Sequence, residues 1–238
     1  MFEDVKFKKL SVEFLKLIQR RYLSEDLYKG NVYLILNVLT KILKQNPLGF
    51  VKLLSLFVGK KFKVSQLEQI LLGFYEGLKV EQIAFYAKPK LTTEEMRIIR
   101  EAFKFGFSLD VISLCAKPDF YFAQKEEIFL GIKKRLSEEQ VKFYAKTEFR
   151  ADQMEQIRLG FENGLTLEQV KLYAKPEFNA EQMEQIRYGF EHGLTLEQVM
   201  LYAKPEFSWC QMCEIRLRLE KGVSKKEVEF SEEEEVEL

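Results

Sequence analysis

One sequence segment recurs along most of this chain at a fixed period, without insertion or deletion. The hexapeptide YAKPEF occurs at 173–178 and again at 202–207, and looser copies begin at Tyr86, Cys115 and Tyr144. The step from each copy to the next is the same throughout. A fixed period of this length is typical of stacked supersecondary units, each too small to bury its apolar face alone.

The period extends well beyond the hexapeptide. We call a set of positions that this period relates to one another a column. One column is entirely isoleucine: Ile70, Ile99, Ile128, Ile157, Ile186 and Ile215. A second is aromatic or leucine: Phe62, Leu91, Phe120, Phe149, Phe178 and Phe207. A third is glycine, interrupted only by Arg135: Gly77, Gly106, Gly164, Gly193 and Gly222. Segments 149–177 and 178–206 differ at only five positions, so the repeat is unambiguous.

Each repeat is predicted to form two helices. In 178–206, Asn179 and Gln182 can cap a first helix, and Gly193 follows it where a left-handed residue would end it. Thr195 and Gln198 form a capping box for a second helix, which we expect Pro205 to terminate. Equivalent boxes are Ser137–Gln140, Thr166–Gln169 and Ser224–Glu227. The phenylalanine of the hexapeptide would then clamp the start of the next first helix.

Another glycine column lies within the first helices, where glycine costs about 1 kcal/mol relative to alanine. Its members are Gly73, Gly131, Gly160 and Gly189, with Ala102 in the gap. These glycines lie on or beside the apolar face that carries the isoleucine column. We therefore expect another helix to approach them closely.

These features predict an all-α chain, a right-handed-type α-solenoid of stacked helix hairpins with a divergent helical N-terminal cap. The hydrophobic fraction of 47% supplies a continuous core, and only five prolines interrupt the chain. The expected parts are a cap at 1–61, a repeat array at 62–224 and an acidic tail at 225–238. The repeats are 62–90, 91–119, 120–148, 149–177, 178–206 and a partial copy, 207–224.

Charge is unevenly distributed although the formal net charge is zero. Residues 1–61 carry twelve basic against five acidic side chains, and 225–238 carry two against seven. The protein is therefore not a uniformly basic nucleic-acid binder. The odd number of cysteines, the absence of a secretory leader pattern and the lack of a long apolar run predict a cytoplasmic protein without a membrane span.

Few residues are candidates for catalysis or metal binding. Cys210 and Cys213 form a C-x-x-C pair, but only His192 and the distant Cys115 could complete a zinc site. His192 has no serine, cysteine or carboxylate placed for a triad, and no phosphate-binding glycine motif occurs. We therefore expect a protein that has no cofactor, no metal and no catalytic residues, and that is not an enzyme.

Two columns are candidates for binding a partner. A lysine column comprises Lys88, Lys117, Lys146, Lys175 and Lys204. These lysines would either stabilise the C-terminal ends of the second helices through the helix dipole, or form a repeated basic surface that binds an acidic partner or a phosphate backbone. A mostly apolar column outside the main stripe includes Leu130, Leu159, Tyr188 and Leu217. These side chains would either pack between repeats or be exposed as a strip that binds a partner. An arginine column could pair with the acidic column Asp110, Glu139, Glu168 and Glu197.

The repeats resemble a short helical repeat found in uncharacterised proteins of bacterial phages and conjugative elements. The resemblance covers about 62–223 and rests on the pattern Q-M-x-x-I-R-x-G-F-E-x-G followed by Y-A-x-P-x-F, clearest in 149–223. The repeat 120–148 departs from it at Lys125, Phe129 and Arg135. The resemblance implies a mobile-element setting and transfers no catalytic residue to this chain.

The sequence thus predicts a non-enzymatic protein that recognises another protein, in this setting an inhibitor of a host defence system. The alternative is a nucleic-acid-associated protein that uses the basic segment 1–61 and the lysine column; an enzyme with an unrecognised site is least supported. Residues 1–61 are also predicted to supply a contact surface for a partner or a second copy, because 49–58 is apolar nearly all round. The oligomeric state and the identity of the partner stay open.

Overall fold

The computed structural model describes residue 56 and residues 60–223, and every regular element in these residues is a helix. The all-α prediction is therefore confirmed for the described part of the chain. The chain divides into two compact units, Met1–Gly106 and Phe107–Leu238, and each is described by itself. Most of the predicted cap at 1–61, the tail at 225–238 and the box Ser224–Glu227 lie outside the described residues.

The described part of the first unit contains one helix hairpin and the first helix of the next. Helix α4 (Val64–Tyr75) packs against both α5 (Val80–Tyr86) and α6 (Thr93–Ala102), and a short 3₁₀ turn, η1 (Phe103–Phe105), continues α6. Isoleucines 70, 83 and 99 are fully buried between these helices.

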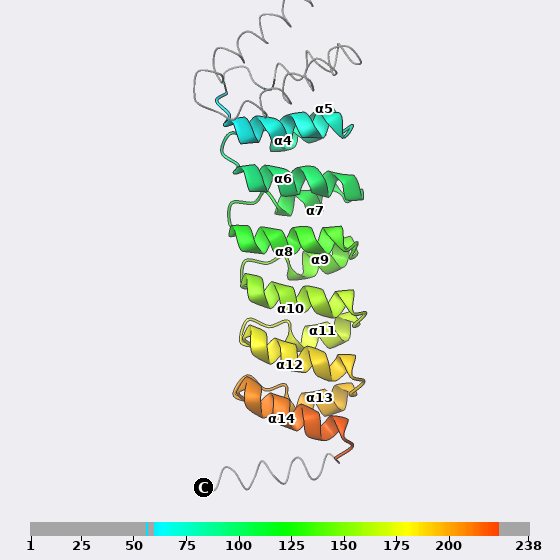
Figure 1. The fold of residues 1–238 in the computed structure, drawn as a ribbon. Helices are drawn as coiled ribbons and strands as arrows, with labels where there is room; N and C mark the ends of the chain where they lie inside the picture. The colour runs from blue at the N-terminus through cyan, green and yellow to red at the C-terminus, as the bar shows by residue number, and fades with distance from the viewer. Residues whose placement is uncertain (1–55, 57–59, 224–238) are drawn as a thin grey trace, which may run out of the picture. The chain divides into compact units, whose positions relative to one another are not determined.

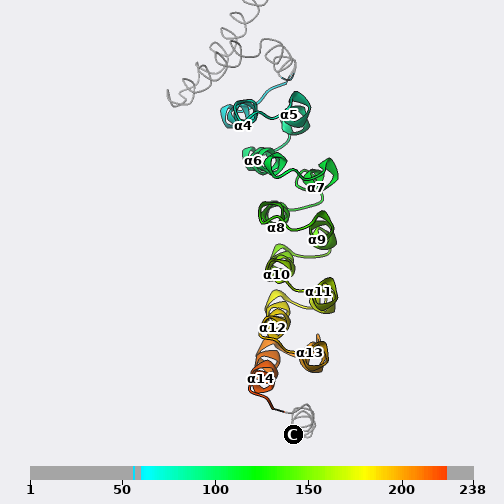
Figure 2. The same ribbon diagram turned by 90° about the vertical axis from the view of Figure 1, so that its right-hand side faces the viewer.

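The second unit contains longer first helices and shorter second helices in alternation (Figure 1). Its helices are α7 (Leu109–Leu114), α8 (Phe122–Lys133), α9 (Glu138–Tyr144), α10 (Ala151–Glu162), α11 (Leu167–Tyr173), α12 (Ala180–Glu191), α13 (Leu196–Tyr202) and α14 (Trp209–Glu220). The first helices α8, α10, α12 and α14 contact one another in succession. Figure 2 shows them on one side of the unit, with the second helices α9, α11 and α13 on the other.

Local capping explains where the helices begin. The predicted boxes form in α9, α11 and α13, and in α12 the amide N–H of Gln182 donates to the side chain of Asn179 at 2.8 Å. First helices without a capping side chain keep half of the box. In α10, for example, the amide N–H of Arg150 donates to Oε1 of Gln153 at 2.8 Å. The glutamine of the third helical position is thus the common element of these helix starts.

The first helices α4, α8, α10, α12 and α14 end in Schellman motifs, as the glycine column predicted, whereas α6 continues into η1. At the end of α12 the amide of Leu194 donates to the carbonyl of Gly189 and the amide of Gly193 to that of Phe190. Gly193 has a φ of 87°, a conformation that costs glycine little. Arg135 replaces the glycine after α8, but it has a φ of 60° and forms the same motif. The backbone conformation is therefore kept although the residue differs.

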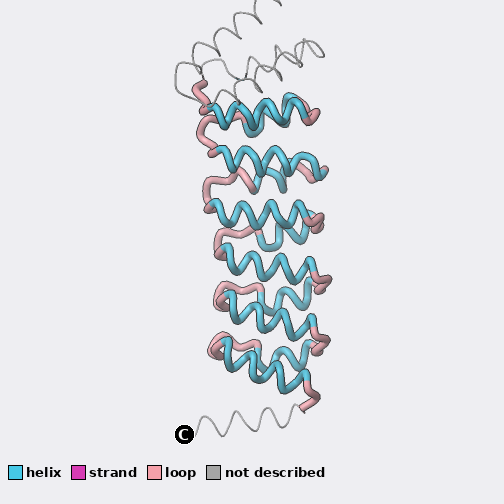
Figure 3. Tube along the Cα trace, viewed as in Figure 1, coloured by secondary structure: helices cyan, strands magenta, loops and turns pink. Residues whose placement is uncertain are grey.

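The second helices end earlier than predicted. In the structure α13 stops at Tyr202, three positions before Pro205, so the prediction that proline terminates it was wrong in detail. The amide of Lys204 donates to the carbonyl of Tyr202 at 2.8 Å, a three-residue turn that leaves Ala203 at φ −75° and ψ 63°. Figure 3 shows the loop that follows each second helix.

The tyrosine of the hexapeptide explains the glycines inside the first helices. The hydroxyl of Tyr173 donates to the carbonyl of Gln156, and a β-carbon on Gly160 would overlap that hydroxyl. The same arrangement links three further pairs: Tyr86 with Gly73, Tyr144 with Gly131, and Tyr202 with Gly189. The expectation of a closely approaching helix is confirmed, and the helix is the second one of the same repeat.

In four first helices, α4, α8, α10 and α12, a buried glutamine joins the helix to the loop that leads into the next repeat. The side-chain amide of Gln153 donates to the carbonyls of Pro176 and Phe178, at 3.2 and 2.6 Å. Gln182 contacts Pro205 and Phe207 in the same way. Proline and phenylalanine of the hexapeptide therefore supply carbonyl acceptors as well as shape.

Candidate protein-binding surface

A row of buried arginines lies beneath the outer face of the first helices. Arg158 donates through Nε to Glu127 on α8 at 2.7 Å and through Nη1 to Glu162 on its own helix at 2.5 Å. The side chain of Arg158 is 7% exposed, so both contacts are shielded from water. The predicted pairing with the column that contains Glu139 and Glu168 was wrong, because these carboxylates lie on the second helices.

The arrangement recurs in the next two first helices. Nε of Arg187 donates to Gln156 at 3.2 Å and Nε of Arg216 donates to Gln185 at 3.2 Å. Each arginine also pairs with the glutamate four residues later on its own helix, Glu191 or Glu220. Every such arginine therefore joins two successive first helices.

Burial and ion pairing pull the carboxylates of this row in opposite directions. Loss of solvation raises the pKa of Glu127, and Arg158 opposes that rise. Burial acts in the same direction on Glu220, but hydrogen bonds from His192 and Arg216 prevail and lower its pKa. The arginines and carboxylates of this row pair with one another inside the protein. The row therefore serves to join neighbouring first helices.

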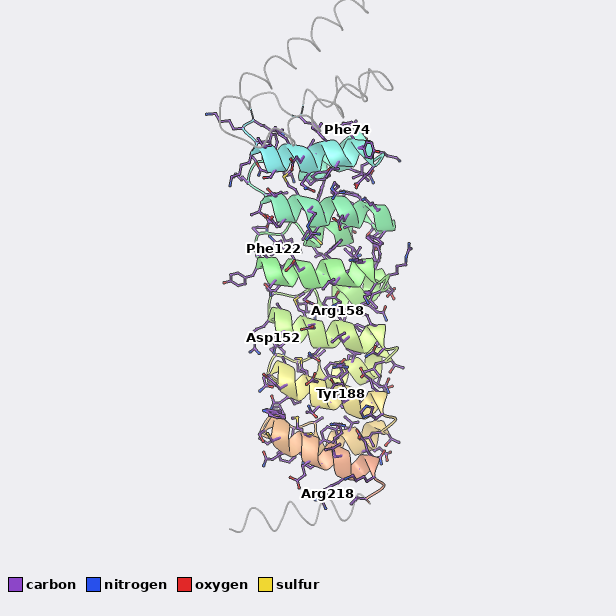
Figure 4. The ribbon with its side chains drawn as sticks, viewed as in Figure 1. Phe74, Phe122, Asp152, Arg158, Tyr188 and Arg218 are labelled. Atoms are coloured by element: carbon purple, nitrogen blue, oxygen red, sulfur yellow. The ribbon has the colours of Figure 1, made fainter. Side chains whose placement is uncertain are left out.

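The predicted apolar column runs alongside this row on α8, α10, α12 and α14. Leu130, Leu159 and Tyr188 are half-buried, whereas Leu217 is 42% exposed. Tyr188, labelled in Figure 4, lies under the guanidinium of Arg187 at 4.5 Å and donates its hydroxyl to Glu184 at 3.1 Å. The column thus combines partial packing between repeats with an accessible apolar surface.

Acidic side chains border this column. Helices α10 and α12 each carry three carboxylates and one arginine, and the arginine is buried in both cases. Every charged side chain that these two helices leave accessible is therefore acidic. The side chains of Glu155 and Glu184 are 48% and 37% exposed. Sequence analysis missed these residues, although the column that they form in the repeat was visible.

The other positions at which the two most similar repeats differ are divided between structure and surface. Asn163 donates to Glu191 at 2.8 Å, and His192 lies 2.8 Å from Glu220, so this column joins neighbouring first helices. Asp152, labelled in Figure 4, is exposed and pairs with Arg150 at 3.0 Å. Asp152 is therefore accessible to a partner, and so are Lys171 and Met200, which occupy another of these positions and are both exposed.

The lysine column lies apart from the apolar column, in the loops after the second helices. Lys204 is half-buried and the other four members are exposed. Lys175 and Lys204 lie over the rings of the phenylalanines three residues later, and Lys146 is 3.7 Å from Glu148. The ammonium groups therefore cover the aromatic side chains of the loop. The structure does not bring the two candidate columns together.

Cysteine and histidine side chains form no metal site in the described residues, where no group of three potential ligands occurs. Cys115 is buried, and loss of solvation raises its pKa to about 12. Cys213 accepts a contact from the guanidinium of Arg216 at 3.7 Å. No described helix is long and apolar enough to cross a membrane.

Comparison with models of protein families, with curated proteins and with solved structures gives no match for this chain.

Proposed function

We propose that this protein is a non-enzymatic helical-repeat protein that binds another protein through the outer face of its first helices. The hairpins of 62–224 would form an α-solenoid. Support comes from contacts that recur with the period of the sequence, such as the tyrosine–glycine pairs and the arginine row of the second unit. Stability in such an array depends mainly on neighbouring repeats.

The solenoid proposal is tested by removing one repeat. A variant without residues 149–177 joins two segments that already share the same register, so it should stay helical and unfold cooperatively. Circular dichroism during thermal unfolding measures both properties. Loss of cooperative unfolding would argue for a single indivisible core.

The observation that carries the binding proposal is the incompletely buried apolar column. The hydrophobic core is already supplied by the isoleucine, tyrosine and methionine side chains between the helices, which are almost fully buried. Leucine at 159 and 217 therefore exposes apolar surface where a polar residue would cost the core little. Apolar side chains that stay partly accessible at the same position of successive repeats are a candidate interaction surface.

Charge favours a protein over a nucleic acid as the partner. The accessible charges of α10 and α12 are acidic and would repel phosphates, and in the lysine column Lys175 and Lys204 lie over aromatic rings. Tagged full-length protein should capture a protein from host lysate, and nuclease treatment should leave the complex intact. Capture of nucleic acid, with affinity that falls steeply as salt rises, would favour the alternative.

In the mobile-element setting that the resemblance implies, the captured protein would belong to a host defence system and binding would inhibit it. Expression of this protein in a host with the defence should restore plating of a restricted phage. The variant Leu159→Asp should not restore it at equal abundance. Restoration by both, or by neither, would argue against inhibition through this face.

A further inference from the structure

The geometry points to a partner of a particular kind, and we infer that the first-helix face of the second unit binds a basic amphipathic α-helix laid across α8, α10, α12 and α14. This inference rests on the proposed function and adds the chemical class of the partner. It follows from the spacing of the apolar column, the sign of the charge beside it and the rigidity of the helices beneath it.

The spacing of the column matches the repeat of an α-helix. Packed helices lie about 8–10 Å apart, so the column presents one apolar side chain at each such interval. Seven residues of an α-helix rise about 10.5 Å, so a crossing helix with an apolar residue at every seventh position meets each first helix once. Covering Leu130, Leu159, Tyr188 and Leu217 takes four such apolar residues, which together span about 22 residues of helix.

The charge beside the column selects a basic partner. Glu126, Glu155 and Glu184 form a column four residues before Leu130, Leu159 and Tyr188, and exposed Asp152 and Glu181 extend it. The buried Arg158 and Arg187 make their shorter contacts to Glu162 and Glu191, at 2.5 and 2.7 Å. They lie 4.0 and 3.8 Å from Glu155 and Glu184, so α10 and α12 each keep more carboxylates than cations. Lysine or arginine on the crossing helix would find carboxylates on this side, and an acidic helix would be repelled.

The surface is held in a defined position before any partner arrives. Arg158 and Arg187 join successive first helices, and Tyr188 is held by Glu184 below the guanidinium of Arg187. Side chains fixed in this way lose little conformational freedom on binding, which favours affinity.

The test uses full-length protein and a labelled synthetic peptide of about four heptads, with leucine at every seventh position, lysine at the flanking positions and alanine elsewhere. Two further peptides replace every lysine by glutamate or every leucine by serine. Fluorescence anisotropy should show the lysine–leucine peptide binding at least about tenfold more tightly than either of the others. Equal binding of the serine peptide would mean simple attraction of a polycation, and absence of binding would overturn the inference.

A pair of charge-reversal variants locates the site. Glu155→Lys with Glu184→Lys should weaken binding of the lysine–leucine peptide at least about tenfold. Glu168→Lys with Glu197→Lys changes the same two repeats and the same net charge on the second helices, and should alter binding by less than about twofold. Equal losses in the two variants would refute the assignment. Circular dichroism confirms that both remain folded.

The same variants separate this inference from the proposed function. If wild type and the first-helix variant capture the same host protein equally well, the protein is a binding protein but the acidic face is not the site. If wild type captures no protein from its host, the proposed function fails.

Discussion

The hydroxyl group of Tyr173 occupies the space that a β-carbon on Gly160 would fill, and it donates a hydrogen bond to the carbonyl of Gln156 at 3.3 Å. This relationship joins the first and second helices of one repeat. The sequence reflects this relationship. In repeat 91–119, where Cys115 replaces the tyrosine, Ala102 replaces the glycine.

Substitution of Gly160 by alanine should destabilise the protein, although alanine favours helix by about 1 kcal/mol. The new methyl group must displace Tyr173, and we expect a net loss of about 1–3 kcal/mol. In a Tyr173→Phe background the overlap is removed and a ring carbon lies at 3.3 Å, so the same substitution should cost much less. A double-mutant cycle by urea denaturation measures this coupling. Additive effects would contradict the account.

Gln153→Glu should destabilise the protein by about 1–3 kcal/mol, because a carboxylate cannot donate to the buried carbonyls of Pro176 and Phe178. Gln169→Glu is the matched control. The side chain of Gln169 accepts a hydrogen bond from the amide of Thr166. A glutamate can make the same contact, because Glu95 accepts from the amide of Thr92 at the equivalent helix start. The control should change stability by less than about 0.5 kcal/mol. Equal thermal shifts would show that the amide of Gln153 contributes nothing.

Arg135→Gly should stabilise the protein by about 0.5–1 kcal/mol, because arginine at a φ of 60° is strained and glycine is not. The reverse change, Gly164→Ala at a φ of 84°, meets no atom within 4 Å, so backbone conformation alone should destabilise it. Thermal unfolding of both variants measures the pair. A destabilised Arg135→Gly would mean that contacts of the arginine outweigh the strain.

Two glutamates of the arginine row should respond oppositely to pH. The pKa of Glu127 is raised by burial, so its contribution to stability is present below the unfolded pKa and is lost as pH rises through the folded value. Glu127→Gln should therefore gain stability relative to wild type between about pH 4 and about pH 7. Glutamine is compatible there, because Gln156 and Gln185 accept from arginine at equivalent positions.

Glu220 provides the opposite case. Despite burial, its pKa is lowered through His192 and Arg216, so its contribution is present above the unfolded pKa and is lost as pH falls. Glu220→Gln should lose more stability relative to wild type at about pH 7 than at about pH 4. Urea denaturation at both pH values gives the two differences. Shifts of the same sign would contradict the assignment.

Ile157→Ala removes a fully buried side chain and should cost about 2–5 kcal/mol. Lys175→Ala removes an exposed side chain 5.9 Å from the ring centroid of Phe178 and should be nearly silent. Equal melting temperatures for the two variants would reverse the assignment of core and surface columns.

Features that depend on contacts within about one helical turn were predictable from the sequence. The capping boxes at Thr166 and Thr195, the left-handed end at Gly193 and the burial of the isoleucine column all follow from local spacing and from the apolar periodicity of a helix. The apolar column of the candidate surface was also identified in this way, but its degree of exposure was left open.

The tertiary structure decided whatever depends on residues that meet across helices. The partner of Arg158 lies 31 residues away, the carbonyls that Gln153 contacts lie 23 and 25 residues away, and the acceptor for Tyr173 lies 17 residues away. The period of the repeat identifies which residues are equivalent, but it does not predict which of them are in contact. The sequence by itself thus determined the helices and their ends at Gly193 and its equivalents. Packing of one helix against the next determined which arginines are buried, and so left α10 and α12 with an acidic outer face.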